Sequence, residues 1–205
     1  GCKVIGLDYS TESNKINNVD YHQLDIRKSK DVSTVFKSIF NKFNQIDVLI
    51  NNAGVGPDLR FEKPERETYN TTFQVNVTGT MFFTEAILTL IPDGGKLLNI
   101  SSKMGSISNC TSSDSVAYKM SKSALNMYTK NLVNRLKGKL DAAAIHPGWV
   151  KTTIMDSNIE LAPLTPEQSA AGIYKFLSSD LVKLQADSSL PVSLLKIVEI
   201  SDSKS

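Results

Sequence analysis

Cysteine is scarce in this sequence, which contains only Cys2 and Cys110 among its 205 residues. Two isolated cysteines cannot build a disulfide scaffold or a cysteine-rich metal site, and the two histidines have no partner at metal-binding spacing. The sequence has no apolar run of membrane-spanning length and no secretory signal pattern. We therefore expect a cytoplasmic protein without a metal or a membrane partner, although residues upstream of Gly1 could carry a targeting segment.

A large excess of charge of either sign is also absent. Lys and Arg together number 23 and Asp and Glu 21, and the basic residues do not gather into the patch that nucleic acid requires. We expect no nucleic-acid partner. The length and the 40% hydrophobic content indicate one globular domain over residues 1–205, with a loose tail from about Ser201 to Ser205.

One pair of residues, Tyr118 and Lys122, is chemically distinctive. Residues four apart on a helix share a face, so the phenol and the ammonium are expected to be neighbours. A nearby cation favours the phenolate, which predicts a Tyr118 pKa below its ordinary value of ~10 and proton transfer near neutral pH. The spacing alone is equally typical of a solvated surface pair, so the interpretation depends on the neighbouring motifs.

Short apolar runs that end in small polar residues precede this pair. The run at 95–102 ends in Ser101 and Ser102, and an earlier run at 46–50 leads into Asn-Asn-Ala-Gly at 51–54. Such runs are typical of buried parallel strands, whose C-terminal ends open into a crevice. Gly54 would leave the backbone there open to a ligand. Asn76 lies between the two runs in a predicted helix, where asparagine has little intrinsic reason to be.

Together these segments resemble the short-chain dehydrogenase/reductase superfamily. The residues at 118–126 and 146–152 are most similar to its sniffer and C-factor-like carbonyl reductases. The resemblance runs from about Lys3 to about Leu177 through ordered motifs at 51–54, 76–79, 100–102, 118–122 and 147–148. It implies an α/β fold with a three-layer, doubly wound, Rossmann-like parallel sheet in the strand order 3-2-1-4-5-6-7. It also implies hydride transfer between a nicotinamide cofactor and a carbonyl or secondary alcohol.

The resemblance assigns catalytic roles to individual residues. Tyr118 would be the general acid/base, Ser102 would donate a hydrogen bond to the substrate oxygen, and Lys122 would acidify the phenol and bind the nicotinamide ribose. Asn76 would hold a water in the relay that reaches Lys122, and the alternative is a merely tolerated asparagine. The interval from serine to tyrosine is about three residues longer than the commonest family form. Two other serines therefore remain alternatives to Ser102, namely Ser101 and Ser106.

The resemblance also implies a cofactor site. Asp8 closes an apolar run and would accept hydrogen bonds from the adenosine ribose while repelling a 2′-phosphate, which favours NAD over NADP, and no arginine lies close by in the sequence. The alternative for Asp8 is a solvated loop aspartate. Asn51 would instead tie neighbouring strands together. The resemblance places Asp25 and Ile26 beside the adenine, and Val150 and Thr152 against the nicotinamide carboxamide. The other residues that it implies along the cofactor are Asp8, Asn52, Ala53, Gly54, Tyr118, Lys122, Pro147 and Gly148.

Periodicity and capping residues predict the remaining elements. They are a helix capped by Ser29, a helix over Pro64–Ile91, the Tyr118 helix ending near Gly138, a helix from Thr165 and Pro166 to about Leu177, strands at Leu140–Ile145 and Leu190–Ile200, and a flexible, mostly apolar flap over Thr153–Leu164.

A glycine-rich phosphate-binding turn is missing. In the family the first strand and this turn hold the cofactor pyrophosphate on backbone amides, and no Gly-x-x-x-Gly-x-Gly pattern occurs in these 205 residues. We expect the absent strand to leave a gap in the centre of the sheet, between the strands that start at Val4 and Ile46. Backbone groups of both neighbours would then be unpaired, unless the neighbours close the gap or water enters. We therefore interpret the sequence as an N-terminally truncated fragment of a longer enzyme.

Two functions follow from this interpretation. The first is a short-chain oxidoreductase that uses NAD, with NADP less favoured, on a small-molecule carbonyl or alcohol substrate. The alternative is a truncated, catalytically silent relative that acts as a binding or dimerisation partner. The family commonly pairs subunits through helices equivalent to Pro64–Ile91 and Val116–Lys137, so a homodimer or homotetramer is expected.

Overall fold

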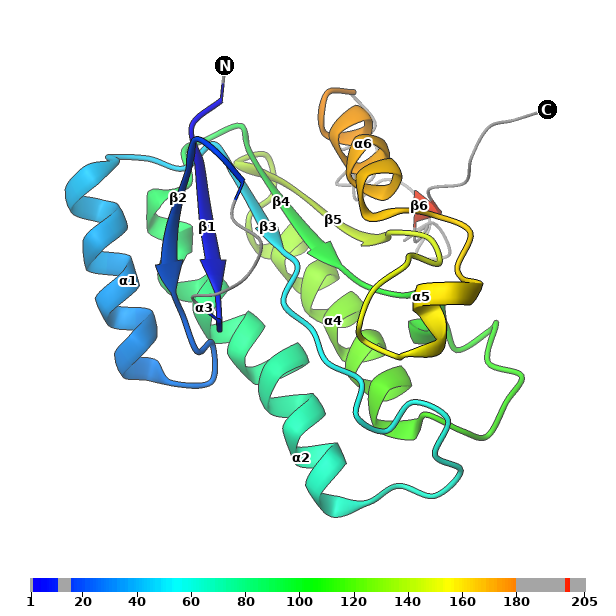
Figure 1. The fold of residues 1–205 in the computed structure, drawn as a ribbon. Helices are drawn as coiled ribbons and strands as arrows, with labels where there is room; N and C mark the ends of the chain where they lie inside the picture. The colour runs from blue at the N-terminus through cyan, green and yellow to red at the C-terminus, as the bar shows by residue number, and fades with distance from the viewer. Residues whose placement is uncertain (1, 11–15, 180–197, 200–205) are drawn as a thin grey trace.

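The structure is a computed structural model that describes residues 2–10, 16–179 and 198–199 (Figure 1). The helices are α1 (Ser29–Lys42), α2 (Arg66–Phe73), α3 (Thr80–Ile87), α4 (Val116–Arg135), α5 (Ser157–Leu161) and α6 (Pro166–Leu177). The strands are β1 (Val4–Asp8), β2 (Val19–Gln23), β3 (Val48–Asn51), β4 (Gly95–Ile100), β5 (Leu140–His146) and β6 (Val198–Glu199), and each strand pair is parallel. Parallel strands alternating with helices are the doubly wound α/β fold that the resemblance implies.

Helices cover both faces of the sheet, which makes three layers. Successive residues of a strand point to opposite faces, so Leu97 and Ala142 belong to the core beneath α1, α3 and α4, whereas Leu98 and Ala143 belong to the core beneath α6. Strands buried on both faces must be apolar almost throughout, which explains the sequences of β4 and β5. The helices contribute Val35, Ile39, Phe83, Ile87 and Leu132 to the first core and Phe176 to the second.

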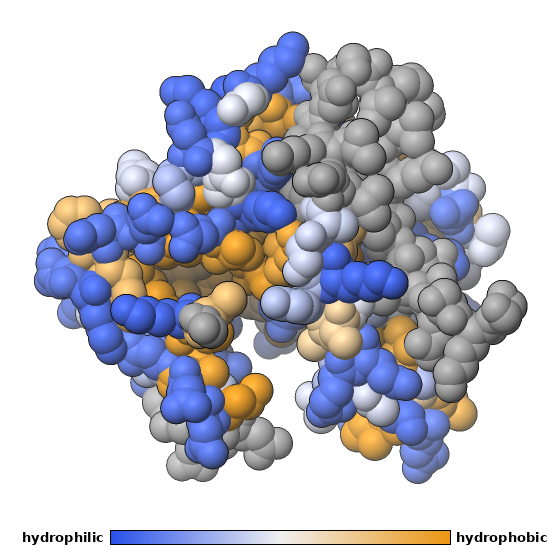
Figure 2. Space-filling view, turned by 90° about the horizontal axis from the view of Figure 1, so that it is seen from above, coloured by the Kyte–Doolittle hydropathy of each residue, from blue (hydrophilic) through white to orange (hydrophobic). Residues whose placement is uncertain are grey.

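The sheet is interrupted between β1 and β3. Among the described residues β1 pairs only with β2, and β3 begins a separate sheet in the order β3-β4-β5-β6. We call the facing sides of β1 and β3 the two open edges, along which Val4, Val48 and Ile50 are between 40% and 48% exposed. Viewed from the end at which β1 begins, the surface shows apolar side chains gathered in a hollow (Figure 2). The neighbouring strands therefore do not close the gap.

The predicted helix over Pro64–Ile91 is confirmed as a helical run from Arg66 to Leu90 that contains two irregular turns. Helices α2 and α3 are joined by a π-helical turn, η1 (Gln74–Gly79), and the 3₁₀ turn η2 (Leu88–Leu90) ends the run. A π-helical turn is rare and is frequently found at functional sites. Asn76 lies in η1, which gives this polar residue a local conformation that the sequence pattern did not predict.

The predicted start of α6 and the predicted end of α4 are confirmed. The Thr165 hydroxyl accepts a hydrogen bond from the Gln168 amide, and the Gln168 side chain accepts one from the Thr165 amide, which makes a capping box at the start of α6. Gly138 follows the end of α4 with a φ of +77°, a conformation that glycine adopts readily. Of the predicted strand at Leu190–Ile200 only β6 lies within the described residues, and the tail at 201–205 lies outside them.

The prediction that Ser29 caps α1 is wrong. Ser29 is the first residue inside the helix, and Lys28 is the N-cap without a side-chain cap bond. The reason is a turn at the end of the preceding strand, in which the Lys28 amide donates a hydrogen bond to the Asp25 carbonyl oxygen at 2.9 Å. This turn begins the helical path one residue earlier than the capping pattern predicts.

Candidate active site

A phenol and a hydroxyl from distant parts of the chain meet beyond the C-terminal end of β4. Tyr118 lies in the first turn of α4, and Ser102 caps the short 3₁₀ turn η3 (Lys103–Gly105) that follows β4. Burial raises the pKa of Tyr118 above its ordinary value of 10.0, and a hydrogen bond with Ser102 lowers it by less than burial raises it. The structure thus places a protonated phenol directly beside a serine hydroxyl.

Ser102 is the serine that contacts the phenol. Its oxygen accepts a hydrogen bond from the Met104 amide at 3.2 Å, which fixes the oxygen while the hydroxyl proton stays available to donate. Ser101 is turned away and donates to Asn126 Oδ1 at 2.6 Å. Ser106 shares a hydrogen bond with Ser108 in the following loop, at 3.1 Å. The two alternatives that the sequence left open are therefore engaged elsewhere.

Lys122 is buried beneath the same ring. Only 4% of the residue is exposed, its Nζ donates a hydrogen bond to the Ile100 carbonyl oxygen at 3.0 Å, and the same atom lies 5.5 Å from the centroid of the Tyr118 ring. Burial lowers the pKa of Lys122 to about 8, because an ammonium loses its hydration in such surroundings. The expected helical juxtaposition of Tyr118 and Lys122 is confirmed, and the pair is not a solvated surface pair.

The predicted lowering of the Tyr118 pKa is not what the structure gives. The sequence pattern considered only the attraction of a nearby cation, whereas burial of the phenol has the larger effect and raises its pKa. The carboxylate of Asp58 adds to this rise by charge repulsion. Without a cofactor the structure therefore favours the protonated phenol, which is the form that donates a proton.

Asn76 is fully engaged at the edge of the site. Its Oδ1 accepts a hydrogen bond from the Val55 amide and its Nδ2 donates to the Val55 carbonyl oxygen, both at 2.8 Å, and Nδ2 also reaches Ser121 Oγ at 3.1 Å. A Cβ added at Gly54 would lie 3.3 Å from Lys122 Nζ and 3.6 Å from Asn76 Oδ1. Gly54 thus leaves open a space flanked by these two polar groups.

A buried amide network ties the strands and helices behind the site. Asn51 Nδ2 donates to Asn99 Oδ1 and to Thr84 Oγ1, each at 2.8 Å, and Asn99 Nδ2 donates to Thr129 Oγ1 at 2.8 Å. The expectation that Asn51 connects neighbouring strands is confirmed, because Asn99 lies beside it on β4. The sequence analysis missed Asn99 and both threonines. A polar residue inside the apolar run of β4 was the available signal.

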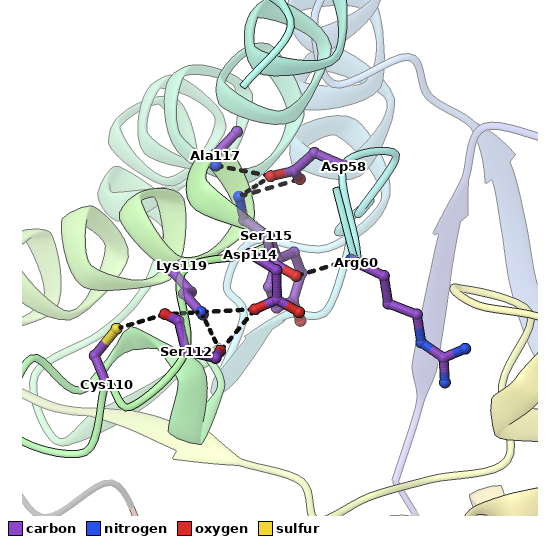
Figure 3. A network of polar contacts seen from close by, with 9 residues as sticks. Asp58, Arg60, Cys110, Ser112, Asp114, Ser115, Ala117 and Lys119 are labelled. Carbon is purple, nitrogen blue, oxygen red and sulfur yellow. Dashed lines mark hydrogen bonds and ion pairs between the residues drawn. The ribbon is translucent and has the colours of Figure 1, made fainter. Parts of the chain in front are cut away.

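Asp58 is a further residue of the site that no sequence pattern indicated. It lies in the loop between β3 and α2, is 1% exposed, and accepts hydrogen bonds from the amides of Ala117 and Tyr118. The carboxylate therefore reaches the first turn of α4 from a loop about sixty positions earlier in the sequence (Figure 3). No local pattern marks this residue, since its partners become neighbours only in the folded chain.

The strand end that carries Asp8 has an arginine nearby after all. Asp8 is exposed and its Oδ1 accepts a hydrogen bond from the Ser10 amide at 2.7 Å. The Arg27 guanidinium lies 5.6 Å from the ring centroid of Tyr9, the residue after Asp8. The sequence analysis found no arginine here because Arg27 follows the next strand, and the parallel pairing of β1 with β2 brings it close.

Asp25 is engaged by a protein side chain, whereas Ile26 is only half-buried. Arg27 donates two hydrogen bonds to the Asp25 carboxylate, each at 2.8 Å, and this pairing lowers the pKa of Asp25 to about 2. Asp25 is buried, and Ile26 packs against the main core. A Cβ at Gly79 would come within 2.9 Å of the Ile26 side chain, so the glycine lets η1 approach this strand end closely.

The other residues implied to line the cofactor lie at the C-terminal ends of β3 and β5. Asn52 and Ala53 follow β3 and are exposed, which leaves them open to a ligand. After β5, Gly148 has a φ of +86° and turns the chain, and the Pro147 carbonyl oxygen accepts a hydrogen bond from Ser169. Val150 forms an isolated bridge with Leu164, and Thr152 is exposed.

The predicted flap contains the short helix α5 and two side-chain anchors. Arg60 Nη2 donates to Ser157 Oγ at 2.9 Å, and Trp149 Nε1 donates to Asn158 Oδ1 at 2.9 Å. These contacts connect α5 to the loop of Asp58 and to the end of β5. Three large apolar side chains nearby are exposed, Trp149, Ile159 and Leu161, and we call these residues the apolar rim.

Neither a metal-binding cluster nor a membrane-spanning helix occurs within residues 2–10, 16–179 and 198–199. No group of three or more His, Cys, Asp or Glu side chains there could hold a metal ion. No helix in the same ranges is long and apolar enough to cross a membrane.

A family model described as short chain dehydrogenase matches residues 1–162. The 3-oxoacyl-[acyl-carrier-protein] reductase of Synechocystis sp. is 28% identical over 171 residues, which cover 77% of this chain and 67% of that reductase. The chain thus spans about two thirds of the length of this relative.

Solved structures with the same fold include carbonyl reductases. The carbonyl reductase Sniffer of D. melanogaster superposes with a TM-score of 0.72 and 29% identity, over 80% of this chain and 72% of that one. An NADPH-bound carbonyl reductase from chicken fatty liver superposes with a TM-score of 0.74 over 86% of this chain and 80% of that one, at an identity of 21% that shows the fold alone. The resemblance stated from the motifs, including the likeness to Sniffer, is confirmed.

Proposed function

We propose that this chain, which belongs to the short chain dehydrogenase family, provides the proton-transfer site of a nicotinamide-dependent carbonyl reductase. The observation that carries the proposal is the contact between the buried Tyr118 phenol and the Ser102 hydroxyl, with the Lys122 ammonium over the same ring. An acid next to a hydrogen-bond donor is what a carbonyl oxygen needs as negative charge develops on it.

Each of four residues has its own role in this proposal. Tyr118 is protonated at neutral pH and gives its proton to the oxygen of the substrate during reduction. Ser102 donates a hydrogen bond to the same oxygen, since its own oxygen is held by the Met104 amide. Lys122 binds the nicotinamide ribose and keeps positive charge beneath the phenol, and Asn76 fixes the Val55 backbone beside them. The cofactor, when bound, supplies or accepts the hydride.

The residues present fit part of a nicotinamide cofactor. Gly54 leaves the space between Lys122 and Asn76 that a side chain would fill, and Asp8 offers an exposed carboxylate to ribose hydroxyls. We propose NAD as the preferred cofactor, because the nearby Arg27 is already paired with Asp25 and the Asp8 charge opposes a 2′-phosphate. The other residues proposed to contact the cofactor are Ile26, Asn52, Ala53, Pro147, Gly148, Val150 and Thr152.

The proposed substrate is a small carbonyl compound or the corresponding alcohol, with apolar substituents. The apolar rim of Trp149, Ile159 and Leu161 exposes large side chains close to the site, and such surfaces commonly bind apolar ligands. Replacing Leu161 by Ser should raise the KM for an aromatic aldehyde more than the KM for a short aliphatic one. Equal changes for both substrates would oppose a role of the rim in binding.

Tyr118→Phe tests the function directly. We expect carbonyl reduction followed by NADH absorbance to fall by about 10²–10⁴-fold, while NADH binding measured by fluorescence changes little. Tyr128→Phe is a matched control on the same helix, because the Tyr128 hydroxyl bonds to Glu85 and not to the site. Parental turnover by the Tyr118→Phe protein would overturn the assignment.

The alternative, a silent dimerisation partner, is favoured by exposed apolar residues on the outer helices. Phe82 on α3 is 61% exposed and Met127 on α4 is 64% exposed. We propose that a second copy covers them in a homodimer or homotetramer, so Phe82→Glu with Met127→Glu should yield monomers in sedimentation velocity. A dimer that shows no NADH binding in a fluorescence titration would favour the silent partner, whereas NADH binding favours the enzyme.

A further inference from the structure

The first turn of α4 is held by a residue outside the helix. A helix leaves its first amides without partners in the helix itself, and a side chain at the N-cap usually accepts from them. Here the N-cap is Ser115, whose φ of +56° and ψ of +40° are left-handed and whose side chain makes no cap bond. The Ser115 hydroxyl instead accepts a hydrogen bond from the Arg60 amide at 2.9 Å. The helix therefore depends on another acceptor.

Asp58 is that acceptor. Its Oδ2 accepts a hydrogen bond from the Ala117 amide at 2.7 Å, and both carboxylate oxygens lie 3.2 Å from the Tyr118 amide nitrogen. Figure 3 shows the Asp58 carboxylate directed at the Ala117 amide. A buried carboxylate that accepts from amides at a helix N-terminus makes strong, charge-assisted bonds and also interacts favourably with the helix dipole.

The loop that carries Asp58 is itself joined to the remainder of the site. The Asn76 side chain pairs with both backbone groups of Val55, three residues before Asp58. Gly56 lies against the Tyr118 ring, since a Cβ there would come 3.2 Å from the ring atom Cδ2. The same loop starts at the Asn-Asn-Ala-Gly turn. The loop between β3 and α2 therefore connects the turn at 51–54 with Asn76 in η1 and with α4, the helix that carries Tyr118.

We infer that Asp58 is the positioning residue for Tyr118, fixing the phenol against Ser102 by holding the backbone from which it projects. The inference rests on the proposed function for the role of Tyr118 but not for the contacts themselves. The charged groups that the structure places against the phenol are the Asp58 carboxylate and the Lys122 ammonium, with the neutral Ser102 hydroxyl beside them. Asp58 therefore affects the phenol through its negative charge as well as through the backbone.

The test compares Asp58→Asn and Asp58→Ala with Asp114→Asn. Asp114 is a matched control, because it lies at the same helix start but bonds to Ser112 and Lys119 instead of the helix amides. Two measurements need no turnover, namely amide exchange at Ala117 and Tyr118 by NMR and titration of the Tyr118 phenol by ultraviolet difference spectra against Tyr118→Phe.

We expect Asp58→Ala to accelerate exchange of both amides by about tenfold or more, because they lose their acceptor. Asp58→Asn keeps an acceptor without the charge, so it should lower the pKa of Tyr118 with little change in exchange. In carbonyl reduction followed by NADH absorbance, Asp58→Ala should reduce kcat by about tenfold or more with an unchanged KM for the cofactor. Asp114→Asn should leave all three readouts at the parental values.

Parental exchange and a parental phenol titration in both Asp58 variants would overturn the inference. If the Asp58→Ala protein fails to fold, titration of the Tyr118 phenol in the Asp58→Asn protein still tests the inference. The proposed function fails separately, namely if Tyr118→Phe keeps parental activity. In that case amide exchange and titration still report whether Asp58 holds the tyrosine, so the two failures are distinguishable.

Discussion

The Lys122 ammonium lies 5.5 Å from the centroid of the Tyr118 ring and donates a hydrogen bond to the Ile100 carbonyl oxygen at 3.0 Å. One nitrogen thus connects the ring on α4 with the last residue of β4. Burial removes most of the hydration of the ammonium, and one carbonyl oxygen and an aromatic face replace it only in part. The pKa of Lys122 is therefore lowered to about 8. A charge kept under these conditions is costly for stability, as expected for a group retained for chemistry.

Replacing Lys122 by Met should increase the free energy of unfolding of the chain more at neutral pH than at alkaline pH. The folded pKa of about 8 lies below the unfolded value of 10.5, so the protonated side chain opposes folding below pH 8, and this cost disappears as pH rises to about 10.5. The cost at pH 7 is on the order of 3 kcal/mol, and the unpaired Ile100 carbonyl in the variant offsets about 1–3 kcal/mol of it.

Urea unfolding of the parent and of Lys122→Met at both pH values measures this difference. The exposed Lys137 on the loop after α4 provides the control substitution Lys137→Met. A variant whose stability relative to the parent is the same at neutral and alkaline pH would show that Lys122 is hydrated in solution.

Reduction and oxidation should respond differently to pH. The raised pKa of Tyr118 keeps the phenol protonated through the neutral range, so kcat/KM for carbonyl reduction should be flat between about pH 6 and pH 7, below the Lys122 pKa of about 8. Alcohol oxidation needs the phenolate and should accelerate with pH, on the order of tenfold per pH unit. Steady-state rates in both directions check this, and a reduction rate that falls off near pH 7 would indicate the lowered pKa that the sequence pattern predicted.

Asp25 should contribute stability that acid removes. Its pKa of about 2 in the folded chain is below the unfolded value of 3.8, so the contribution is complete above about pH 4 and is lost as pH falls towards 2. Because Arg27 is partly exposed, solvent reduces the effect, and Asp25→Asn should cost about 1–2 kcal/mol at pH 7. Thermal unfolding should show this loss shrinking towards pH 2. Asp156→Asn, at an exposed position, should change little at either pH.

The open edge of β3 can be tested by making the same substitution there and in the main core. Val48 on β3 is 40% exposed, whereas Val35 on α1 is 4% exposed and lies in the main core. Val→Thr keeps the shape but adds a hydroxyl, so Val35→Thr should cost about 1–3 kcal/mol and Val48→Thr within about 0.5 kcal/mol. Equal costs in chemical unfolding would mean that Val48 is covered in solution and the edge is closed.

The sequence was sufficient for the elements that local patterns control. The helix over Pro64–Ile91, the capping box at Thr165 and the turn at Gly138 depend on periodicity, proline and glycine within a few positions of each other. The i to i+4 spacing of Tyr118 and Lys122 is likewise fixed by helix geometry. The prediction that Ser29 caps α1 was wrong because a turn at the end of the preceding strand competes with the local capping signal.

Tertiary structure alone decided the electrostatics and the long-range partners. Spacing placed an ammonium near a phenol, but only burial in the folded chain sets the directions in which the pKa values of Tyr118 and Lys122 move. Arg27 beside Tyr9 and Asp58 at the start of α4 come from segments that the parallel sheet brings together. Hydration and distant contacts depend on the whole packed molecule, so no short stretch of residues can encode them.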